Sequence, residues 1–411
     1  MGEGRGSSVK VAADGTIIES SSSSSSSFSS PVSTFDEMGL KMNVLRGIFA
    51  YGFEKPTDIQ SRAIVPLSQG YDVLAQAQSG TGKTGTFGAA ILQRVDLALK
   101  GVQAIVLCPT HELAGQSRDV IQGLASKMEG LLVRLCIGGT NVREDVDALK
   151  TGTVQVVVGT PGRVAQLVSK NGLRMDHLKL FIIDEADVML DLGFQEELEQ
   201  VFKKLTDQTQ VGLFSATMKE HTLGIANKLL RKDKAITILV KAEEVPLKGI
   251  AQYYIPVEKE DWKLDTLSDL YENLSVSAAI IFTASQEKVD WLAARMTERD
   301  FAVSSIHGKM DKETRKTVME QFRTGESRVL ITTDLLARGI DVPQVSLVIN
   351  YDLPDDLEMY IHRIGRAGRH GKKGTAINFA TLRDMSYLKV IENHYHKAFA
   401  ITSMPMDLTA L

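Results

Sequence analysis

Three carboxylates stand together directly after a short apolar run in the first half of the chain. The run Phe181–Ile183 leads into Asp184, Glu185 and Asp187. Like charges gathered at the end of a buried segment cost free energy unless positive charge lies among them. Carboxylates can hold a divalent cation or orient an attacking water molecule, and either task is a reason to place them there. The pattern therefore predicts a positive partner close to these residues.

A second segment that can do chemistry is AQSGTGKT, from Ala77 to Thr84. It lies between a short apolar run and a stretch of helical periodicity. In that setting Gly80 and Gly82 allow backbone N–H groups to turn around a phosphate. Lys83 would reach the outer phosphates, and the hydroxyl of the last residue would bind Mg²⁺. Ala77 stands where the usual eight-residue pattern begins with glycine, but the strand–loop–helix order favours a phosphate site over a glycine-rich loop without a ligand.

The carboxylates and the phosphate loop would form one site if both segments lie at the same edge of a sheet. Asp184 would then hold the Mg²⁺ ion that is bound by Thr84 and the nucleotide, and Glu185 would orient the attacking water. In this interpretation the metal ion is the missing positive charge. Asp187 is assigned to contacts across the site. The alternative, a solvated acidic turn, fits poorly after an apolar run and beside a phosphate loop.

The elements that must position these residues are short apolar runs alternating with longer amphipathic stretches. The first set is DVLAQA, AIVLCPT, VQVVVGT, LFIIDEAD and VGLFSAT, and the second is AAIIFTAS, AVSSIHG, RVLITTD, VSLVINYD and GTAINFA. Strands that are apolar on both faces and separated by helices are typical of a parallel sheet covered by helices. Sites in such sheets lie at the carboxyl ends of the strands, where the chemically active segments stand. The sequence predicts an α/β fold with two tandem parallel-sheet domains.

The predicted domain boundaries follow the composition. Residues 1–33 are rich in serine and poor in large apolar residues, so we expect a disordered tail. The first domain is predicted over 34–240 and the second over 252–411. Between them, residues 241–251 contain proline, glycine and mixed charge and are predicted to be a short linker.

The charge balance limits how the protein could hold a polyanion. The net charge is −4, and neither domain has an excess of lysine and arginine. A polyanion would therefore be held by placed backbone amides and a few arginines and not by a broad positive field. Cys108 and Cys136 stand in apolar runs and are expected to be small buried hydrophobes. Trp262 and Trp291 stand in helical patterns and are expected to pack in the interior.

Further segments complete a set of motifs. DEAD spells residues 184–187, GFEKPTDIQ precedes the phosphate loop, SAT spans 215–217, ARGID ends at 341 and HRIGRAGR spans 362–369. In this order they resemble the motifs of the DEAD-box ATP-dependent RNA helicases, and the resemblance extends from Phe35 to the C-terminus. It implies two RecA-like domains, ATP and Mg²⁺ as cofactors, and single-stranded or short duplex RNA, bound without sequence preference, as the partner.

The resemblance also implies roles for individual residues. Gln60 would hydrogen-bond the adenine, Asp341 would touch the ribose or bridge the domains, and Arg163 would supply charge to the RNA backbone. Arg366 and Arg369 would reach the γ-phosphate from the second domain. The implied ATP-binding residues are Phe53, Lys55, Gln60, Ser79, Gly80, Thr81, Gly82, Lys83, Thr84, Gly85, Asp341, Arg366 and Arg369. Of the site residues, Lys83, Asp184, Glu185, Arg366 and Arg369 would be catalytic, and Thr84 and Asp184 would hold the metal. The implied RNA-binding residues are Pro109, Thr110, Gly138, Gly139, Thr160, Pro161, Gly162, Arg163 and Thr333, and the coupling residues are Asp187, Ser215, Thr217 and His362.

Three positions depart from the family pattern. His111 stands in PTHELA where the family has arginine. The family segment FxNTR reads FTASQ, which replaces its polar and cationic residues with Ala284, Ser285 and Gln286. Lys312 replaces a glutamine and adds a charge. The ATP residues are intact while the RNA residues are not, so we expect a weaker RNA grip than is usual for the family.

Within the family, the stretches LRGIFAYGFEKP, KVDWL, VPQVSLVINYDLP and MPMDL resemble the translation initiation factor 4A group, including its nuclear exon-junction paralogue. Either resemblance implies a monomer, cytoplasmic or nuclear, with a helical-repeat scaffold partner of the initiation-factor 4G type. The leading hypothesis is an RNA-dependent ATPase that locally opens short duplexes in translation initiation or mRNA processing. The alternative is an ATP-gated RNA clamp that acts mainly as an assembly platform. A DNA translocase is a distant third.

Overall fold

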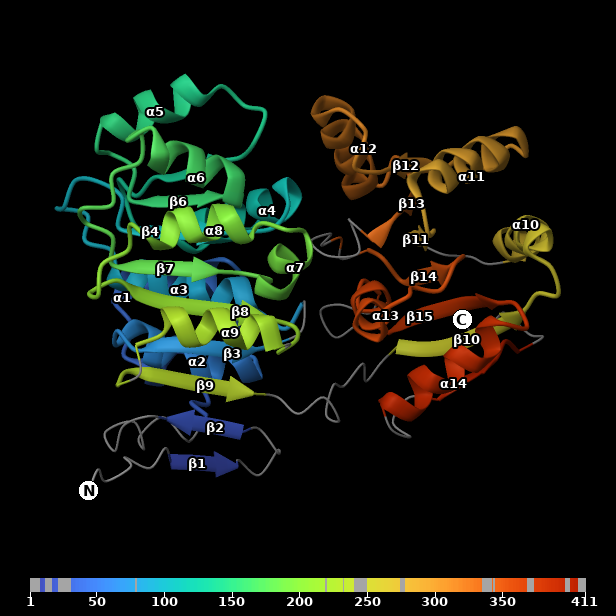
Figure 1. The fold of residues 1–411 in the computed structure, drawn as a ribbon, viewed down its shortest axis with the longest axis horizontal. Coiled ribbons are helices and arrows are strands. Elements are labelled where there is room, and N and C mark those ends of the chain that lie inside the picture. Colours follow the sequence, from blue (N-terminus) through green and yellow to red (C-terminus); the bar gives the residue numbers. More distant parts are fainter. Residues whose placement is uncertain are drawn as a thin grey trace. The chain divides into compact units, whose positions relative to one another are not determined.

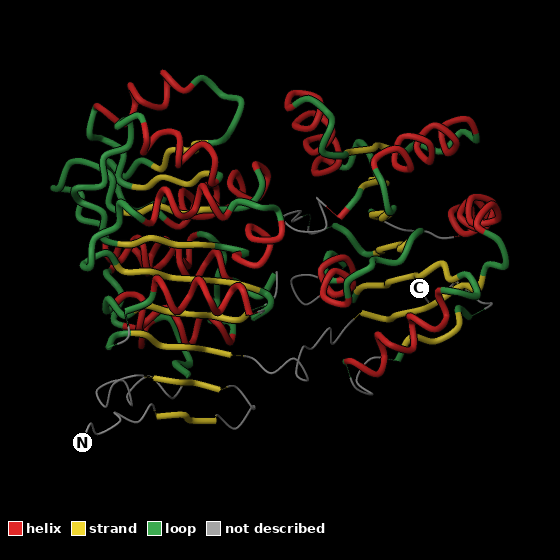
Figure 2. Tube along the Cα trace, in the orientation of Figure 1, coloured by secondary structure: helices red, strands yellow, loops and turns green. Residues whose placement is uncertain are grey.

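The computed structural model describes the chain except for residues 1–7, 12–16, 21–30, 78–79, 219, 232, 240–249, 274–277, 335–341, 343, 368–372, 396–399 and 406–411. The chain divides into two compact units, Met1–Glu244 and Val245–Leu411. In each unit, strands lie between helices (Figures 1 and 2). The boundary between the units falls within the predicted linker 241–251, most of which lies outside the described residues.

The first unit is built on a sheet in the order β1-β2-β9-β3-β8-β7-β4-β6-β5. From β9 to β5 all pairings are parallel. These strands are β3 Asp72–Gln76, β4 Ala104–Leu107, β5 Val133–Cys136, β6 Val156–Gly159, β7 Leu180–Ile183, β8 Gln210–Ser215 and β9 Ala235–Leu239. The strands β4, β6 and β7 are buried along their whole length, as expected of apolar strands covered on both faces.

Helices cover both faces of this sheet. One face packs against α1 Met42–Ala50, α2 Asp58–Ser68, α3 Lys83–Arg94 and α4 His111–Leu124. The other packs against α5 Val142–Lys150, α6 Pro161–Ser169, α7 Ala186–Asp191, α8 Gln195–Phe202 and α9 Glu220–Leu229. Cys108 and Cys136 are buried in these two layers, as predicted. Burial raises the pKa of the Cys136 thiol to about 12.

Part of the N-terminal segment differs from the disordered tail predicted for residues 1–33. The strands β1 Ser8–Val11 and β2 Ile17–Ser20 form an antiparallel hairpin, and β2 pairs with β9 (Figure 1). Both strands carry β-branched residues, which favour strands, and β9 would otherwise leave an unpaired sheet edge. Amino-acid composition gave no sign of that edge, because it is a property of the folded sheet.

The second unit is a parallel sheet in the order β12-β13-β11-β14-β15-β10-β16. Its strands are β10 Ile250–Pro256, β11 Ala279–Phe282, β12 Ser304–Ile306, β13 Val329–Thr332, β14 Leu347–Asn350, β15 Gly374–Ala380 and β16 Ile401–Ser403. One face packs against α10 Lys263–Asn273 and α11 Gln286–Glu298. The other packs against α12 Lys312–Thr324, α13 Leu357–Ile364 and α14 Asp384–His394. The first two residues of β10, Ile250 and Ala251, lie within the predicted linker.

The interior packing predicted for the two tryptophans is wrong. Trp262 is 47% exposed and Trp291 is 42% exposed. A helical position predicts periodic burial but does not say which side of the helix faces the sheet. Within the described part of the chain, we find no helix of the length and apolarity that a membrane span requires.

Candidate active site

The phosphate loop and the carboxylates lie along one edge of the first sheet. Both β3 and β7 pair with β8, so the segments that follow these three parallel strands lie side by side (Figure 1). Lys83 is the first residue of α3, after the loop that follows β3, and Asp184 follows β7. Gly80 and Gly82 have φ angles of 85° and 100°, which glycine adopts without strain.

A buried ion cluster joins the two segments. Lys83 Nζ lies 2.7 Å from Glu185 Oε1 and 3.9 Å from Asp184 Oδ1. Burial lowers the pKa of the Lys83 ammonium, but the two carboxylates outweigh burial and the pKa lies above its ordinary value. Burial raises the pKa of Asp184 to about 7, although Lys83 opposes this rise. Lys83 therefore supplies part of the positive charge that the sequence interpretation assigned to a metal ion alone.

The cluster still has an excess of negative charge. Asp184, Glu185 and Asp187 are all buried, and no group among the described residues hydrogen-bonds the Oε2 atom of Glu185. Glu185 also has a φ angle of 52°, a left-handed conformation that is uncommon for residues other than glycine. Strained backbone of this kind persists where the surroundings impose it and is concentrated at functional sites. The arrangement fits a site that accepts a further cation.

The last carboxylate of the DEAD motif is tied to the end of β8. Thr217 Oγ1 donates a hydrogen bond to Asp187 Oδ2 over 2.9 Å, and the Asp187 amide donates to Ser215 Oγ over 3.3 Å. All three residues are buried. A change at the carboxylates can therefore be transmitted to the SAT segment, which is the role that the resemblance implies.

Gln60 lies against the phosphate loop. Its Oε1 atom accepts a hydrogen bond from the Thr57 amide over 2.9 Å, and its Nε2 atom donates to the Gly82 carbonyl over 3.4 Å. A Cβ atom at Gly82 or Gly85 would lie under 3.0 Å from this amide, so glycine is needed at both positions. One N–H and one lone pair of the Gln60 amide remain for a base.

The structure describes only some of the other predicted ATP residues. Phe53 stacks on Phe35 with ring centroids 6.4 Å apart, and Lys55 is exposed. Thr81 and Thr84 are partly buried in and after the loop. Ser79, Asp341 and Arg369 lie outside the described residues.

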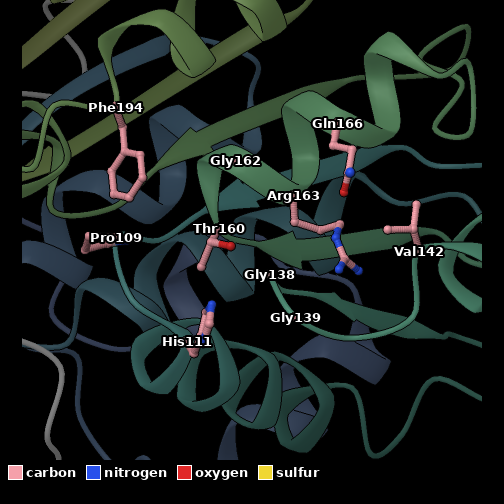
Figure 3. A pocket seen from close by; sticks show the side chains of 10 residues that line it. All are labelled: Pro109, His111, Gly138, Gly139, Val142, Thr160, Gly162, Arg163, Gln166 and Phe194. Carbon is pink, nitrogen blue, oxygen red and sulfur yellow. The ribbon is translucent and has the colours of Figure 1, made fainter. Parts of the chain in front are cut away.

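A pocket of about 510 Å³ lies at the ends of β4, β5 and β6 (Figure 3). We call it the first groove. Its lining residues are Pro109, His111, Gly138, Gly139, Val142, Thr160, Gly162, Arg163, Gln166 and Phe194. Six of these are predicted RNA contacts, and the His111 side chain is among those that line the pocket. Of the other two predicted contacts in this unit, Thr110 caps α4 and Pro161 is the first residue of α6.

Arg163, a predicted RNA contact, is held by several contacts within the first unit. Its guanidinium is buried and forms an ion pair with Asp145. It also donates hydrogen bonds to the Thr140 carbonyl over 2.6 Å and to the Thr140 hydroxyl over 2.8 Å. The same carboxylate accepts hydrogen bonds from Arg134. Arg163 therefore braces the loop before α5, and one carboxylate is shared between two guanidinium groups.

A second pocket, of about 430 Å³, lies at the ends of β11 and β13, and we call it the second groove. It is lined by Ala284, Ser285, Gln286, Glu287, Lys309, Thr333 and Asp334. The three substituted residues of FTASQ and the predicted RNA contact Thr333 thus lie together. Sequence reasoning did not identify Glu287 and Lys309, although Glu287 directly follows a segment that it did identify.

The arginine motif begins in α13. Arg363 is almost fully buried and forms two hydrogen bonds with the Asp334 carboxylate. His362 and Arg366 are buried, and Arg366 Nε donates to the His362 carbonyl over 3.0 Å. These contacts fix the motif to the segment after β13 that contains Thr333 and Asp334.

Comparison with known proteins places these features in a family. A family model described as DEAD/DEAH box helicase matches residues 57–224, and one described as helicase conserved C-terminal domain matches residues 262–371. The chain is 53% identical to an ATP-dependent RNA helicase eIF4A of Neurospora crassa, over 94% of this chain and 96% of that protein. A protein of the same name from Aspergillus clavatus is 54% identical, over 92% of this chain and 94% of that protein. The solved structure of Saccharomyces cerevisiae Dbp5 bound to RNA and ADP BeF3 has a TM-score of 0.84 and 36% identity, and covers 91% of this chain and 96% of that chain.

The chain therefore belongs to the DEAD-box helicase family. This confirms the prediction of an ATP-dependent RNA helicase built on two RecA-like domains. The predicted resemblance to the initiation factor 4A group is also confirmed.

Replacing the two central residues of the ion cluster should separate ATP binding from turnover. Glu185→Gln removes the water-orienting carboxylate, and we expect turnover to fall at least about a hundredfold while ATP remains bound. Lys83→Ala removes the cation that faces the phosphates and should abolish nucleotide-dependent function. Steady-state ATPase rates and binding of a fluorescent ATP analogue measure the two effects. Turnover of Glu185→Gln at the parent rate would show that Glu185 does not orient the water.

The position of Gln60 predicts a preference for adenine. Gln60→Glu keeps the acceptor for the Thr57 amide but removes the donor that could face the base. We expect the ratio of kcat/KM for ATP over GTP to fall on the order of tenfold or more. Competition assays with both nucleotides under saturating RNA measure this ratio. Equal use of ATP and GTP by the parent protein would contradict the assignment.

Proposed function

We propose that this helicase hydrolyses ATP in response to RNA and uses the cycle to open short RNA duplexes in translation initiation. The observation that carries the proposal is the chain of contacts from Lys83 through the DEAD carboxylates to Thr217. These contacts join the residues that are suited to ATP chemistry to the SAT segment. The family resemblance implies that this segment couples ATP hydrolysis to strand separation. The identity of 52–54% to eIF4A helicases over most of the chain supports the role in initiation.

The residues at the cluster fit a Mg²⁺ ion that arrives with the nucleotide. Among the residues that the structure describes, no group of three or more His, Cys, Asp or Glu side chains could hold a metal by itself. Mg²⁺ commonly binds one or two carboxylates together with phosphate oxygens and water. Asp184 and the Thr84 hydroxyl would hold it here. When bound, it would neutralise charge on the transferred phosphate.

Competition for Lys83 gives the chain a means to respond to ATP. The Lys83 ammonium is paired with Glu185. Phosphate oxygens of ATP would compete for the same ammonium and release the Glu185 carboxylate to orient water. Arg366 and Arg369 would serve as arginine fingers from the second unit, with Asp341 at the ribose or bridging the two units. The water would then be activated only when the phosphates are in place.

Both grooves are suited to a nucleic-acid backbone. Gly138, Gly139 and Gly162 allow close approach in the first groove, and Thr333 offers a hydroxyl in the second. Contacts of this kind bind sugar and phosphate and carry no base information. We therefore propose that RNA is bound without sequence preference.

A scaffold protein of helical repeats, of the initiation-factor 4G type, is the proposed protein partner. Exposed tryptophans are enriched where proteins bind one another, and Trp262 and Trp291 are both close to half exposed. Lys288 on α11 forms an ion pair with Glu260 in the short helix that contains Trp262. The two tryptophans therefore belong to neighbouring elements of the second unit and are suited to a common interface.

One observation favours the alternative of an ATP-gated RNA clamp with little strand separation. The grooves hold His111 and Gln286 where the family has arginine, and the buried Arg163 is paired with Asp145. A weak grip would limit the work that one ATP cycle can do on a duplex.

A duplex-release assay beside an ATPase assay distinguishes the two functions. For a helicase, we expect ATP turnover to rise with RNA and a labelled strand to be released from a short duplex in the presence of ATP. RNA-stimulated turnover without strand release would favour the clamp. If RNA changes neither rate, the proposed function is wrong.

The substituted groove residues predict weak, salt-sensitive RNA binding. A well-made charge-assisted phosphate contact is worth about 1.5–3 kcal/mol, and less when solvent screens it. His111→Arg together with Gln286→Arg should therefore tighten RNA binding by about tenfold to a hundredfold. ATP affinity should not change. Fluorescence anisotropy with labelled RNA and with a labelled ATP analogue, each at two salt concentrations, measures both affinities. An unchanged RNA affinity would mean that neither side chain faces the RNA.

A further inference from the structure

The second groove has an unusual charge arrangement for a site that would bind RNA. It lies at the carboxyl ends of β11 and β13, which are paired neighbours in the sheet. Two of its lining residues, Glu287 and Asp334, are acidic. Lys309 is the one cation among the described residues that line it. The substitution at Gln286 has removed the arginine that the family places in this segment.

The two carboxylates are in different situations. Asp334 is held by two hydrogen bonds from the buried Arg363 guanidinium, so its charge is compensated inside the protein. Glu287 instead pairs with Lys309, with Oε1 and Nζ 2.8 Å apart. Both of these side chains are about 70% exposed, at 72% and 70%. The Glu287–Lys309 pair is therefore the part of the groove that an incoming ligand can rearrange.

The backbone places the two partners firmly even though their side chains are exposed. Glu287 lies in the first turn of α11, whose N-cap Ser285 accepts a hydrogen bond from the Lys288 amide. Lys309 follows β12 in a turn where its amide donates to His307 Nδ1 over 3.3 Å. His307 Nε2 in turn lies 3.0 Å from Asp290 on α11. This contact fixes the turn to the helix that carries Glu287.

An exposed ion pair contributes little to stability because water and salt screen it. A phosphate oxygen is a strong acceptor for the same ammonium, and Thr333 in this groove is already a predicted backbone contact. We propose that Lys309 binds an RNA phosphate in the second groove and that Glu287 competes with this phosphate for Lys309. The inference rests on the proposed RNA helicase function and adds two residues to it. Lys309 thus supplies, from the turn after β12, the charge that is missing at Gln286.

The competition persists across the physiological pH range. The hydrogen bond from Lys309 lowers the pKa of Glu287 to about 2, and Glu287 raises the pKa of Lys309 above its ordinary value. The carboxylate is therefore charged well below neutral pH and the ammonium well above it. Asp290 is the other carboxylate that acts on Lys309, also raising its pKa. Salt, and not pH, is the variable that tests the pair.

The test uses the full-length protein, fluorescein-labelled oligouridylate and a non-hydrolysable ATP analogue with Mg²⁺. RNA affinity is measured by anisotropy over a series of salt concentrations for Lys309→Gln, Glu287→Gln and the double variant. Arg295→Gln is the matched control, because Arg295 lies on α11 in an exposed ion pair with Glu298 and does not line the groove. The ATPase rate without RNA and the Tm report on folding.

Lys309→Gln should weaken RNA binding about five- to tenfold at low salt and reduce the slope of log affinity against log salt by about 0.7. Glu287→Gln should tighten binding about two- to fivefold, and this gain should vanish when Lys309 is also replaced. Arg295→Gln should behave as the parent protein does.

Three other results would each contradict a specific part of the proposal. If Lys309→Gln and Arg295→Gln bind RNA alike, Lys309 does not contact the phosphate. If Glu287→Gln tightens binding equally with and without Lys309, the carboxylate repels RNA directly and does not compete for the lysine. If the parent protein binds no RNA with the ATP analogue, the proposed function fails together with this inference, whereas the first two results leave that function intact.

Discussion

A buried carboxylate is stable only when positive charge lies against it, and this requirement ties together the active-site elements of the first unit. Lys83 provides that charge through its 2.7 Å contact with Glu185. The contact requires β3 and β7 to flank β8, and Gly82 to turn the chain into α3 with a φ angle of 100°. The edge-on contact of Phe87 with Phe214, with ring centroids 5.4 Å apart, packs α3 on β8. Strand order, glycine position and aromatic packing thus all support one ion pair.

The same electrostatic requirement explains why nucleotide and metal ion must act together. The site holds one ammonium among three buried carboxylates, and ATP would bring further negative charge. A free triphosphate would therefore be repelled where a Mg²⁺-bound triphosphate would not, because the ion offsets the charge that both carboxylates and phosphates contribute. Burial raises the pKa of Asp184, so its charged form is costly in this site. Selection for the proposed magnesium complex would follow from the protein's own charges.

The sequence could predict the parts of the structure that depend on local chemistry. Apolar runs gave the strands, and the rule that parallel strands end at one edge brought Lys83, Asp184 and Thr217 together. The direction of individual side chains was not predictable in this way. Arg163 stands in a motif that is associated with RNA, yet its guanidinium forms an ion pair with Asp145. The two residues are distant in the sequence, so this pair could not be predicted before the fold was known. Lys309 and Glu287 are ordinary surface residues in the sequence and become neighbours only because β12 lies beside β13.

These compensated charges bear on how RNA binding can depend on ATP. Arg163 is paired with Asp145, Arg363 binds Asp334 and Lys309 pairs with Glu287, so each groove has these cations partly offset by carboxylates. Each groove should bind a backbone weakly. Two weak sites joined in one chain bind tightly only when both can engage the same strand, because the second contact is then intramolecular. If ATP governs when the two units can share one RNA, weak grooves are an advantage: RNA is held while ATP is bound and released after hydrolysis.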